Sequence, residues 1–260
     1  MSLNLVRAGD GAGVVLLHGL TATHRYVVMG SRSLERSGHD VVAYDARGHG
    51  ASDPAPSAEA YTYEDLTADL AGVLDEVGFE RAVLAGASMG AHTALRFALE
   101  HPERVAGLVV ITPAFDPGDF PGDLDRWDRL SDGLRVGGVE GFVDAYDVST
   151  APERWRDTVE RVLRQRMAAH EHPEAVADAL RATPRSRPFE SLEQLREIRV
   201  PTVVVADRDE PDAGHPLAVG ERYAATIPGA RLVVEEEGQS PIAWQGGQLS
   251  KVIADVAARA

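Results

Sequence analysis

The sequence contains no cysteine and no apolar run that approaches the length of a membrane span. Without cysteine, the chain can form neither a disulfide framework nor a thiolate metal site, and a cysteine nucleophile is excluded. A helix that crosses a bilayer needs about 20 consecutive apolar residues. Residues 1–7 also lack the basic flank and apolar core that are typical of a signal peptide. These absences predict a cytoplasmic globular protein with no membrane partner.

Positive charge is also scarce in this chain. Lysine and arginine together number 26 against 41 aspartates and glutamates, which gives a formal net charge of -15. An acidic surface repels phosphate, so we do not expect nucleic acid as a partner. The histidines are scattered without ligand spacing, and no phosphate loop or dinucleotide fingerprint occurs, so neither a metal nor another cofactor is expected. With 260 residues, 44% of them hydrophobic, the chain can build one large core.

The most informative stretch is Gly-Ala-Ser-Met-Gly at 86–90. It follows an apolar run at 82–85 and precedes a helix-like run at 91–99, so it reads as strand, sharp turn and helix. The spacing Gly-x-Ser-x-Gly is that of a nucleophile elbow, in which glycines let the strand and the helix approach closely. The helix would then direct its free N–H groups at Ser88, which suits a developing oxyanion. The alternative is an ordinary turn between a strand and a helix.

Apolar runs of the buried-strand type alternate with helix-like segments along the chain. A short first strand is expected at 3–8, and the buried strands are expected at 14–17, 40–45, 82–85, 105–112, 200–206 and 230–234. The helix-like segments are 27–37, 62–78, 91–99 and 249–257. This alternation predicts an α/β fold with a mostly parallel sheet covered by helices on both faces. In such sheets the site lies beyond the carboxyl ends of the strands.

The segment 114–190 interrupts this alternation. It has no buried strand run, and its apolar residues recur at helical spacing among many charges. We therefore expect a core domain made of 1–113 and 191–260, with 114–190 inserted as a helical lid. Aromatic residues of the insertion that would line a pocket, or alternatively form the lid's own core, are Trp127, Phe142, Tyr146 and Trp155.

Three further polar motifs also follow strands. They are His-Gly at 18–19, Asp-Ala-Arg-Gly-His-Gly-Ala-Ser at 45–52, and Ala-Asp-Arg-Asp at 206–209. With the elbow at Ser88 between them, the chain resembles the α/β-hydrolase superfamily over nearly its whole length. The resemblance implies an α/β-hydrolase fold with a helical lid and Ser88 as the nucleophile. It also implies that the backbone N–H groups of Leu20 and Met89 form an oxyanion hole.

The same resemblance implies an acid of a catalytic triad at Asp209, with Asp207 as the second choice. The alternative for Asp209 is a loop carboxylate that caps the next helix. His18 would shape the oxyanion loop through structural hydrogen bonds and would not act as the base. The residues interpreted as braces of the neighbouring loop are Asp45, Arg47 and His49.

One position departs from the family pattern. The base is usually a histidine after the last strand, in a Gly-His context, whereas Gln239 stands there in this sequence. A carboxamide cannot accept a proton near neutral pH and return it. Loss of the triad histidine costs about 10⁶ in turnover in a comparable enzyme. We therefore expect Gln239 to approach Ser88 without serving as an ordinary base.

Three interpretations remain open. In the first, another histidine is the base, and His215 is the one downstream of Asp209; it lies in a loop that should border the crevice, or it simply introduces the next helix. His24 and His92 are weaker candidates, and His92 is more readily explained as packed against the sheet. In the second, the protein binds a ligand without catalysis. In the third, it performs slow acyl transfer in which the substrate supplies the base.

The sequence thus predicts a hydrolase that acts on a small carboxylic ester, thioester or related acyl compound through Ser88. The alternative is a catalytically weak ligand-binding protein with the same fold and pocket. The identity of the substrate, the oligomeric state and whether Gln239 is natural or introduced stay open.

Overall fold

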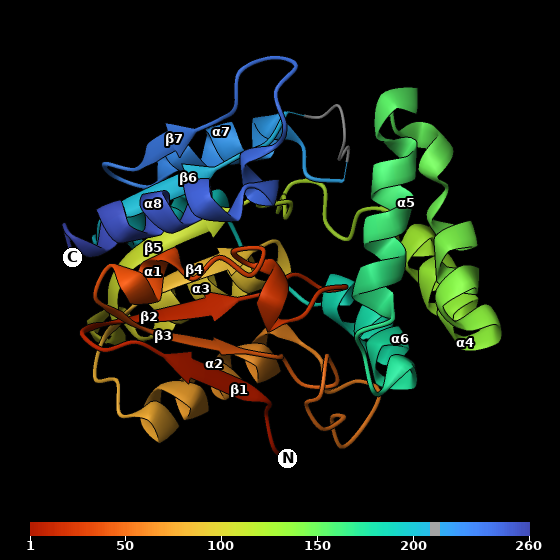
Figure 1. The fold of residues 1–260 in the computed structure, drawn as a ribbon, viewed down its shortest axis with the longest axis horizontal. Helices are drawn as coiled ribbons and strands as arrows, with labels where there is room; N and C mark the ends of the chain where they lie inside the picture. The colour runs from red at the N-terminus through yellow and green to blue at the C-terminus, as the bar shows by residue number, and fades with distance from the viewer. Residues whose placement is uncertain (209–213) are drawn as a thin grey trace.

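A seven-stranded, mostly parallel sheet forms the centre of the computed structural model, which describes residues 1–208 and 214–260 (Figure 1). The strands are β1 (Leu5–Ala8), β2 (Ala12–Leu17), β3 (His39–Tyr44), β4 (Ala82–Ala87), β5 (Val105–Ile111), β6 (Thr202–Val205) and β7 (Arg231–Val233). Their order across the sheet is β1-β3-β2-β4-β5-β6-β7. β1 pairs antiparallel with β3, and the other described pairs are parallel. The expected α/β sheet is confirmed.

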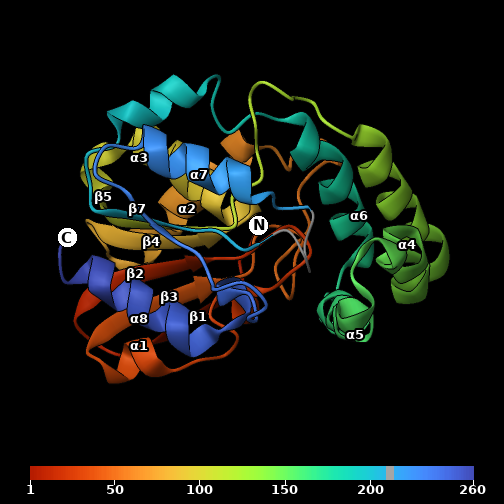
Figure 2. The ribbon, with the colours of Figure 1, turned by 90° about the horizontal axis from the view of Figure 1, so that it is seen from above.

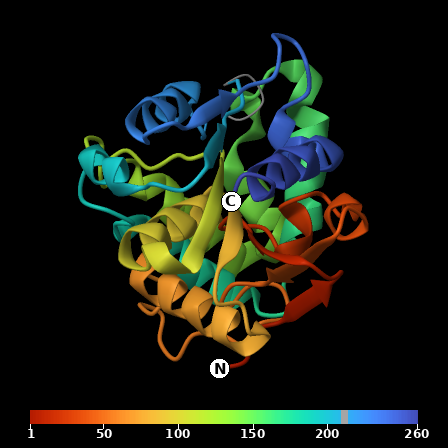
Figure 3. The same cartoon turned by 90° about the vertical axis from the view of Figure 1, so that its left-hand side faces the viewer.

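Helices cover both faces of this sheet (Figure 2). One face carries α2 (Tyr63–Val77), α3 (Met89–Glu100) and α7 (Leu217–Thr226), and the other carries α1 (Ser33–Arg36) and α8 (Gly246–Ala257). Successive strand residues alternate between the two layers: Val15 and Leu17 pack in the core with α2 and α3, whereas Val14 and Leu16 pack in the core with α8. This period of two explains why the strands read as continuous apolar runs. Figure 3, which faces the end remote from the insertion, shows the same flanking helices.

Local sequence signals set the ends of α2. The Thr62 side chain and the Asp65 side chain each accept from the other's backbone N–H, which makes a capping box. At the other end, Gly78 takes a left-handed conformation with φ 74°, a conformation that glycine adopts without steric cost. Both signals are readable in the sequence, and the expected helix at 62–78 agrees with the structure to within a residue.

The expectation of a helix over 27–37 is wrong. Only α1 forms there, preceded by a 3₁₀ turn at His24–Tyr26. Between them Met29 and Gly30 have positive φ angles of 49° and 73°, which no continuing right-handed helix can contain. The apolar spacing of this segment reflects burial of Val27, Val28 and Leu34 in the core on the α8 face.

A helical insertion separates β5 from β6 and lies beyond the carboxyl ends of the strands (Figure 1). It contains α4 (Leu124–Tyr146), α5 (Glu153–Met167) and α6 (Pro173–Ala182). α4 is kinked at Gly138, where φ is 60°, and its two halves meet through backbone contact between Gly133 and Gly141. The remaining 3₁₀ turns are Pro102–Arg104, Val148–Thr150, Thr183–Arg185, Leu192–Glu197 and Ile242–Trp244. Within the two described ranges, no helix is both long and apolar enough to span a bilayer.

Candidate active site

Ser88 occupies a strained turn between the end of β4 and the start of α3. Its backbone has φ 50° and ψ -112°, a left-handed φ that costs free energy in a residue other than glycine. A Cβ atom on Gly86 would overlap the Gly90 carbonyl, and one on Gly90 would overlap the Leu17 carbonyl. Glycine at both positions is therefore what allows strand and helix to meet so closely. This geometry is that of a nucleophile elbow.

His215 lies directly against this serine. Its Nε2 is 2.8 Å from Ser88 Oγ, a distance typical of a hydrogen bond between a hydroxyl and an imidazole. The residue is half-buried and precedes α7, which begins at Leu217. The serine can donate its proton to Nε2 when the imidazole is neutral and protonated on Nδ1. The pair therefore has the geometry of an activated nucleophile and its base.

The sequence offered two carboxylates for the acid, Asp209 and Asp207, and the structure describes only Asp207. Asp209 falls within 209–213 and so lies outside the described residues. Asp207 is buried, with 2% of its surface exposed, and lines the same cavity as Ser88 and His215. Its Oδ1 accepts a hydrogen bond from the backbone N–H of Ala243 at 3.2 Å. A fixed carboxylate thus faces the crevice from the end of β6.

Gln239 lies elsewhere. It is exposed in the turn after β7, where its backbone N–H donates to Glu236 O at 3.0 Å. Among the described residues that line the crevice around Ser88, Gln239 is absent. The structure thus brings His215, and not the expected Gln239, to the serine. The physical reason is that the imidazole reaches Ser88 from the segment between β6 and α7, whereas Gln239 lies in the turn after β7.

The two backbone groups expected to bind an oxyanion border the same crevice. Leu20 and Met89 are both buried, and both line it beside Ser88. Met89 opens α3, so its N–H has no partner within the helix. Within residues 1–208 and 214–260, neither N–H donates to a protein acceptor. Both donors are therefore available to a bound oxygen atom.

Two buried histidines, His18 and His49, hold the loop that contains Leu20. His18 accepts from the Ala46 N–H through Nε2 and contacts Gly19 O through Nδ1, each at 2.8 Å. Burial lowers the pKa of His18 to about 3, so it stays neutral. The Nε2 of His49 is 2.6 Å from Leu20 O, the carbonyl of the residue expected to supply an oxyanion donor. These contacts agree with a structural and not a proton-transferring part for both rings.

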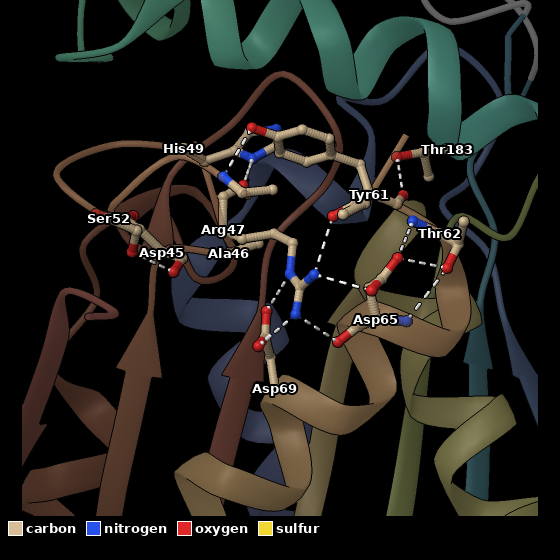
Figure 4. Close-up of polar contacts among 12 residues, drawn as sticks. Asp45, Ala46, Arg47, His49, Ser52, Tyr61, Thr62, Asp65, Asp69 and Thr183 are labelled. Carbon is tan, nitrogen blue, oxygen red and sulfur yellow. Dashed lines mark hydrogen bonds and ion pairs between the residues drawn. The ribbon is translucent and has the colours of Figure 1, made fainter. Parts of the chain in front are cut away.

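An ion-pair cluster holds the loop that follows β3 (Figure 4). The Arg47 guanidinium contacts Asp69 at 2.7 Å and Asp65 at 3.0 Å, and it also donates to Ala60 O at 2.9 Å. Burial would raise the pKa of the neighbouring Asp45, but hydrogen bonds from His24 and Asn4 outweigh it and hold that pKa well below its usual range. The loop is therefore fixed by charge-assisted hydrogen bonds on both sides.

The two weaker base candidates are engaged away from the serine hydroxyl. His24 contacts Asp45 at 2.9 Å through Nδ1. His92 lies one helical turn after Ser88, where its Nε2 accepts from the N–H groups of Ala114 and Phe115, each at 3.1 Å. Burial lowers the pKa of His92 to about 3. A ring whose Nε2 already accepts two hydrogen bonds and which resists protonation is poorly suited to act as the base.

Ser88 lines both branches of a crevice between the sheet edge and the insertion. One branch, which we name the aromatic branch, is a cavity of about 160 Å³. Its ring-bearing lining residues are Tyr26, Trp127, Phe142, Tyr146, His215 and Trp244. The other, which we name the acidic branch, has a volume of about 310 Å³. Its carboxylates are Asp116, Asp119 and Asp123. Together these volumes suit a small organic molecule.

Two arginines of the insertion also line the aromatic branch, namely Arg126 and Arg166. Sequence reasoning missed them because charged residues on an amphipathic helix usually face water. As for metals, the described ranges contain no group of three or more histidine, aspartate or glutamate side chains arranged to hold an ion.

Comparison with known proteins identifies the family. The model of the α/β-hydrolase fold matches residues 14–246. The chain belongs to the α/β-hydrolase family. A similar α/β-hydrolase is 2-hydroxy-6-oxononadienedioate/2-hydroxy-6-oxononatrienedioate hydrolase 2 of Pseudomonas putida, which is 35% identical over 240 residues, covering 87% of this chain and 80% of that protein. This relative and a similar putative carbamate hydrolase of Variovorax paradoxus are hydrolases, which supports hydrolase as the general class of this protein.

Solved structures of other α/β-hydrolases agree. An esterase of Thermogutta terrifontis, solved with malate bound, superimposes with a TM-score of 0.80 at 28% identity, covering 97% of this chain and 92% of the esterase. The enol-lactonase of Burkholderia xenovorans LB400 superimposes with a TM-score of 0.79 at 24% identity, covering 98% and 96% of the two chains. At that identity the second likeness supports the fold alone.

Proposed function

We propose that this α/β-hydrolase cleaves a small carboxylic ester, thioester or related acyl compound, with Ser88 as the nucleophile and His215 as the base. The observation that carries the proposal is the 2.8 Å contact between His215 Nε2 and Ser88 Oγ. Of the interpretations that the sequence left open, this contact favours the one in which another histidine replaces the missing base. Gln239 has no part in the proposed chemistry.

The proposed reaction has two halves. In the first, His215 takes the Ser88 proton while Oγ attacks the acyl carbon, and the imidazolium then returns that proton to the leaving group. The oxyanion formed on the acyl oxygen is stabilised by the N–H groups of Leu20 and Met89. In the second half, water loses a proton to His215 as it attacks the acyl-serine; the acyl–Oγ bond then breaks, the imidazolium gives its proton to Ser88 Oγ, and the acid product leaves.

A carboxylate from the loop after β6 would orient the imidazole. Asp209 remains our first choice for this part, because it has the position of the acid in the family pattern. Asp207 is the second, supported by its burial and its place in the cavity lining. Either carboxylate would keep the proton on Nδ1 and stabilise the imidazolium. Asparagine variants of the two positions distinguish them, since the true acid loses far more activity.

We also propose that the insertion 114–190 acts as a lid over the core formed by 1–113 and 191–260. Seven of the residues that line the aromatic branch come from α4 and α5: Arg126, Trp127, Leu130, Phe142, Tyr146, Leu163 and Arg166. Enclosure of the crevice would exclude water from the oxyanion and strengthen its hydrogen bonds. A cytoplasmic location and a small-molecule substrate belong to the same proposal.

The decisive experiment is active-site labelling with a fluorophosphonate. Attack by Ser88 Oγ on phosphorus would expel fluoride and leave a covalent adduct, which peptide mass spectrometry can locate. We expect the adduct on Ser88, none on a Ser88→Ala variant, and labelling slowed at least 100-fold in His215→Ala, since the hydroxyl then lacks its base. Absence of both labelling and ester turnover in the unaltered protein would instead support a ligand-binding protein.

A further inference from the structure

Arg126 is placed unlike the other arginines of the insertion. It lies in the first turn of α4, is half-buried, and lines both branches of the crevice. Its guanidinium carbon lies 5.6 Å from the centre of the Trp127 ring and 5.5 Å from that of Tyr146. Such contacts hold a cation in place but leave its five N–H donors unused.

The contrast is with arginines on the outer surface of the same helices. Arg135 pairs with Glu174 and Asp178, and Arg164 pairs with Glu140 and Glu160. Within the ranges 1–208 and 214–260, the Arg126 guanidinium has neither an ion pair nor a hydrogen bond to protein. The nearby carboxylate of Asp123 accepts the backbone N–H of Arg126, at 2.9 Å, and so caps the helix. A half-buried guanidinium that pairs with none of the described carboxylates is suited to bind the anion of a ligand.

The charges around the crevice indicate which branch an anion would enter. The acidic branch is lined by Asp116, Asp119 and Asp123, so a carboxylate there would meet like charge, although Asp116 is neutralised by Arg222 at 2.7 Å. Among residues 1–208 and 214–260, the aromatic branch is lined by two guanidinium groups, those of Arg126 and Arg166, and by the carboxylate of Asp207. In a chain of net charge -15, these two cations make the described lining of this branch better suited to an anion than that of the acidic branch.

We propose that Arg126 selects acyl substrates that carry a carboxylate, and that this carboxylate lies in the aromatic branch while the reacting carbonyl lies at Ser88. The inference rests on the proposed function and specifies its substrate class. A planar guanidinium fork binds a carboxylate through two parallel hydrogen bonds, which a neutral amide of the same size cannot match. The volume of about 160 Å³ limits the carboxylate-bearing arm to a short chain.

The test compares two esters of equal size that differ in charge. The probes are mono(4-nitrophenyl) adipate and 4-nitrophenyl 5-carbamoylpentanoate, whose chains are long enough to avoid attack by the substrate's own carboxylate. We expect the unaltered protein to prefer the adipate in kcat/KM. Arg126→Gln should lower the ratio of the two kcat/KM values about 10- to 100-fold, because a hydrogen bond to a charged group is lost. Arg126→Lys should retain part of the preference.

A matched control is Arg129→Gln, which removes an exposed arginine one turn further along α4. It should leave the ratio unchanged, so a general effect of charge on the insertion can be told from a site at Arg126. Equal turnover of both esters by the unaltered protein, or an Arg126→Gln ratio equal to that of the unaltered protein, would overturn the proposal. Thermal unfolding of each variant checks that the fold is retained.

A binding measurement distinguishes failure of the proposed hydrolase activity from failure of the proposed carboxylate site. Calorimetry with monomethyl adipate and its carbamoyl analogue needs no turnover and can be done on Ser88→Ala. Preference for the adipate that disappears in Ser88→Ala/Arg126→Gln would support the carboxylate site even if no ester is hydrolysed. Equal binding of the two compounds to Ser88→Ala would sink the carboxylate site, whether or not Ser88 proves to be a nucleophile.

Discussion

The turn that holds Ser88 and the loops that follow β6 and β7 lie at the same edge of the sheet, but they relate to sequence differently. At the turn, five consecutive residues contain the whole device: two glycines remove clashing Cβ atoms, and the serine between them takes the strained conformation. In the loops, the residue that matters is the one that reaches Ser88 across space. His215 is 127 positions away from Ser88 and meets it at 2.8 Å.

A motif that depends on local backbone geometry can be located from the sequence alone. A residue that contacts Ser88 from a distant part of the chain can come from more than one loop, so its position in the sequence is harder to predict. Gln239 occupies the usual position after the last strand but remains exposed to solvent. We make four predictions that test this contrast between local and distant determinants, beginning with the largest expected effect.

Removal of either member of the Ser88–His215 pair should have the largest effect. We expect His215→Ala and Ser88→Ala each to lower kcat for 4-nitrophenyl butyrate by about 10³- to 10⁶-fold, and the double variant to lose little more, because the two act as one unit. Steady-state kinetics measures this. His172→Ala, which removes another half-buried histidine at the start of α6, is the control. Additive losses in the double variant would contradict a shared mechanism.

The turn can be broken through its glycines. Gly90→Val should destabilise the fold by about 3 kcal/mol or more, because its side chain would be forced against the Leu17 carbonyl. Urea unfolding gives the free energy. Gly72→Ala is the matched control, since a Cβ there meets no atom within 4 Å and lies in α2. That exchange should stabilise the helix by up to about 1 kcal/mol, and an equal loss in both variants would refute a local constraint.

The sequence predicted the fold well where the physics is local. Buried strands, the helix α2 and the elbow follow from periodicity and from residue types that favour one backbone conformation. The helix predicted at 27–37 was wrong because the buried residues Val27, Val28 and Leu34 have helical spacing although the backbone turns at Met29. The other features of the site depend on contacts between residues far apart in the sequence. No spacing in the sequence connects Arg126 to the crevice, and His215 could be named only as one histidine among several.

Low pH should destabilise the loops that are held by buried histidines near the site before it affects the hydrophobic core. Burial lowers the pKa of His18 to about 3 and of His170 to about 4, from an ordinary 6.5. The unfolded chain therefore binds more protons between pH 6.5 and 4, and stability falls as pH drops through that window. Each such ring contributes a loss of roughly 1–3 kcal/mol. Urea unfolding at pH 7 and pH 4.5 measures it.

His170 offers the sharper version of that experiment. Its Nδ1 accepts the Gly50 N–H at 2.9 Å, which ties the insertion to the loop after β3. His170→Gln can still accept this hydrogen bond but cannot titrate, so the stability difference between pH 7 and pH 4.5 should shrink. A difference equal to that of the unaltered protein would show that protonation of His170 does not contribute to the acid loss.

The smallest effect is expected at Gln239. Sequence alone favours a large gain from Gln239→His, because that exchange restores the family's usual base. With His215 already against Ser88, a second imidazole has no proton to carry, and Gln239 is exposed after β7. We therefore expect Gln239→His and Gln239→Ala to change kcat/KM for 4-nitrophenyl butyrate by less than about threefold, within the range of substitutions away from buried features.

The double variant His215→Ala/Gln239→His then asks whether the loop after β7 can still deliver a base. Recovery of two or more orders of magnitude over His215→Ala would show that both loops reach Ser88, since even an imidazole misplaced by about 1 Å retains part of its effect at a cost of about 10². No recovery would show that the loop after β7 has lost that reach. A gain of 100-fold from Gln239→His alone would contradict the assignment of His215, because a protein with a working base has no such gain available.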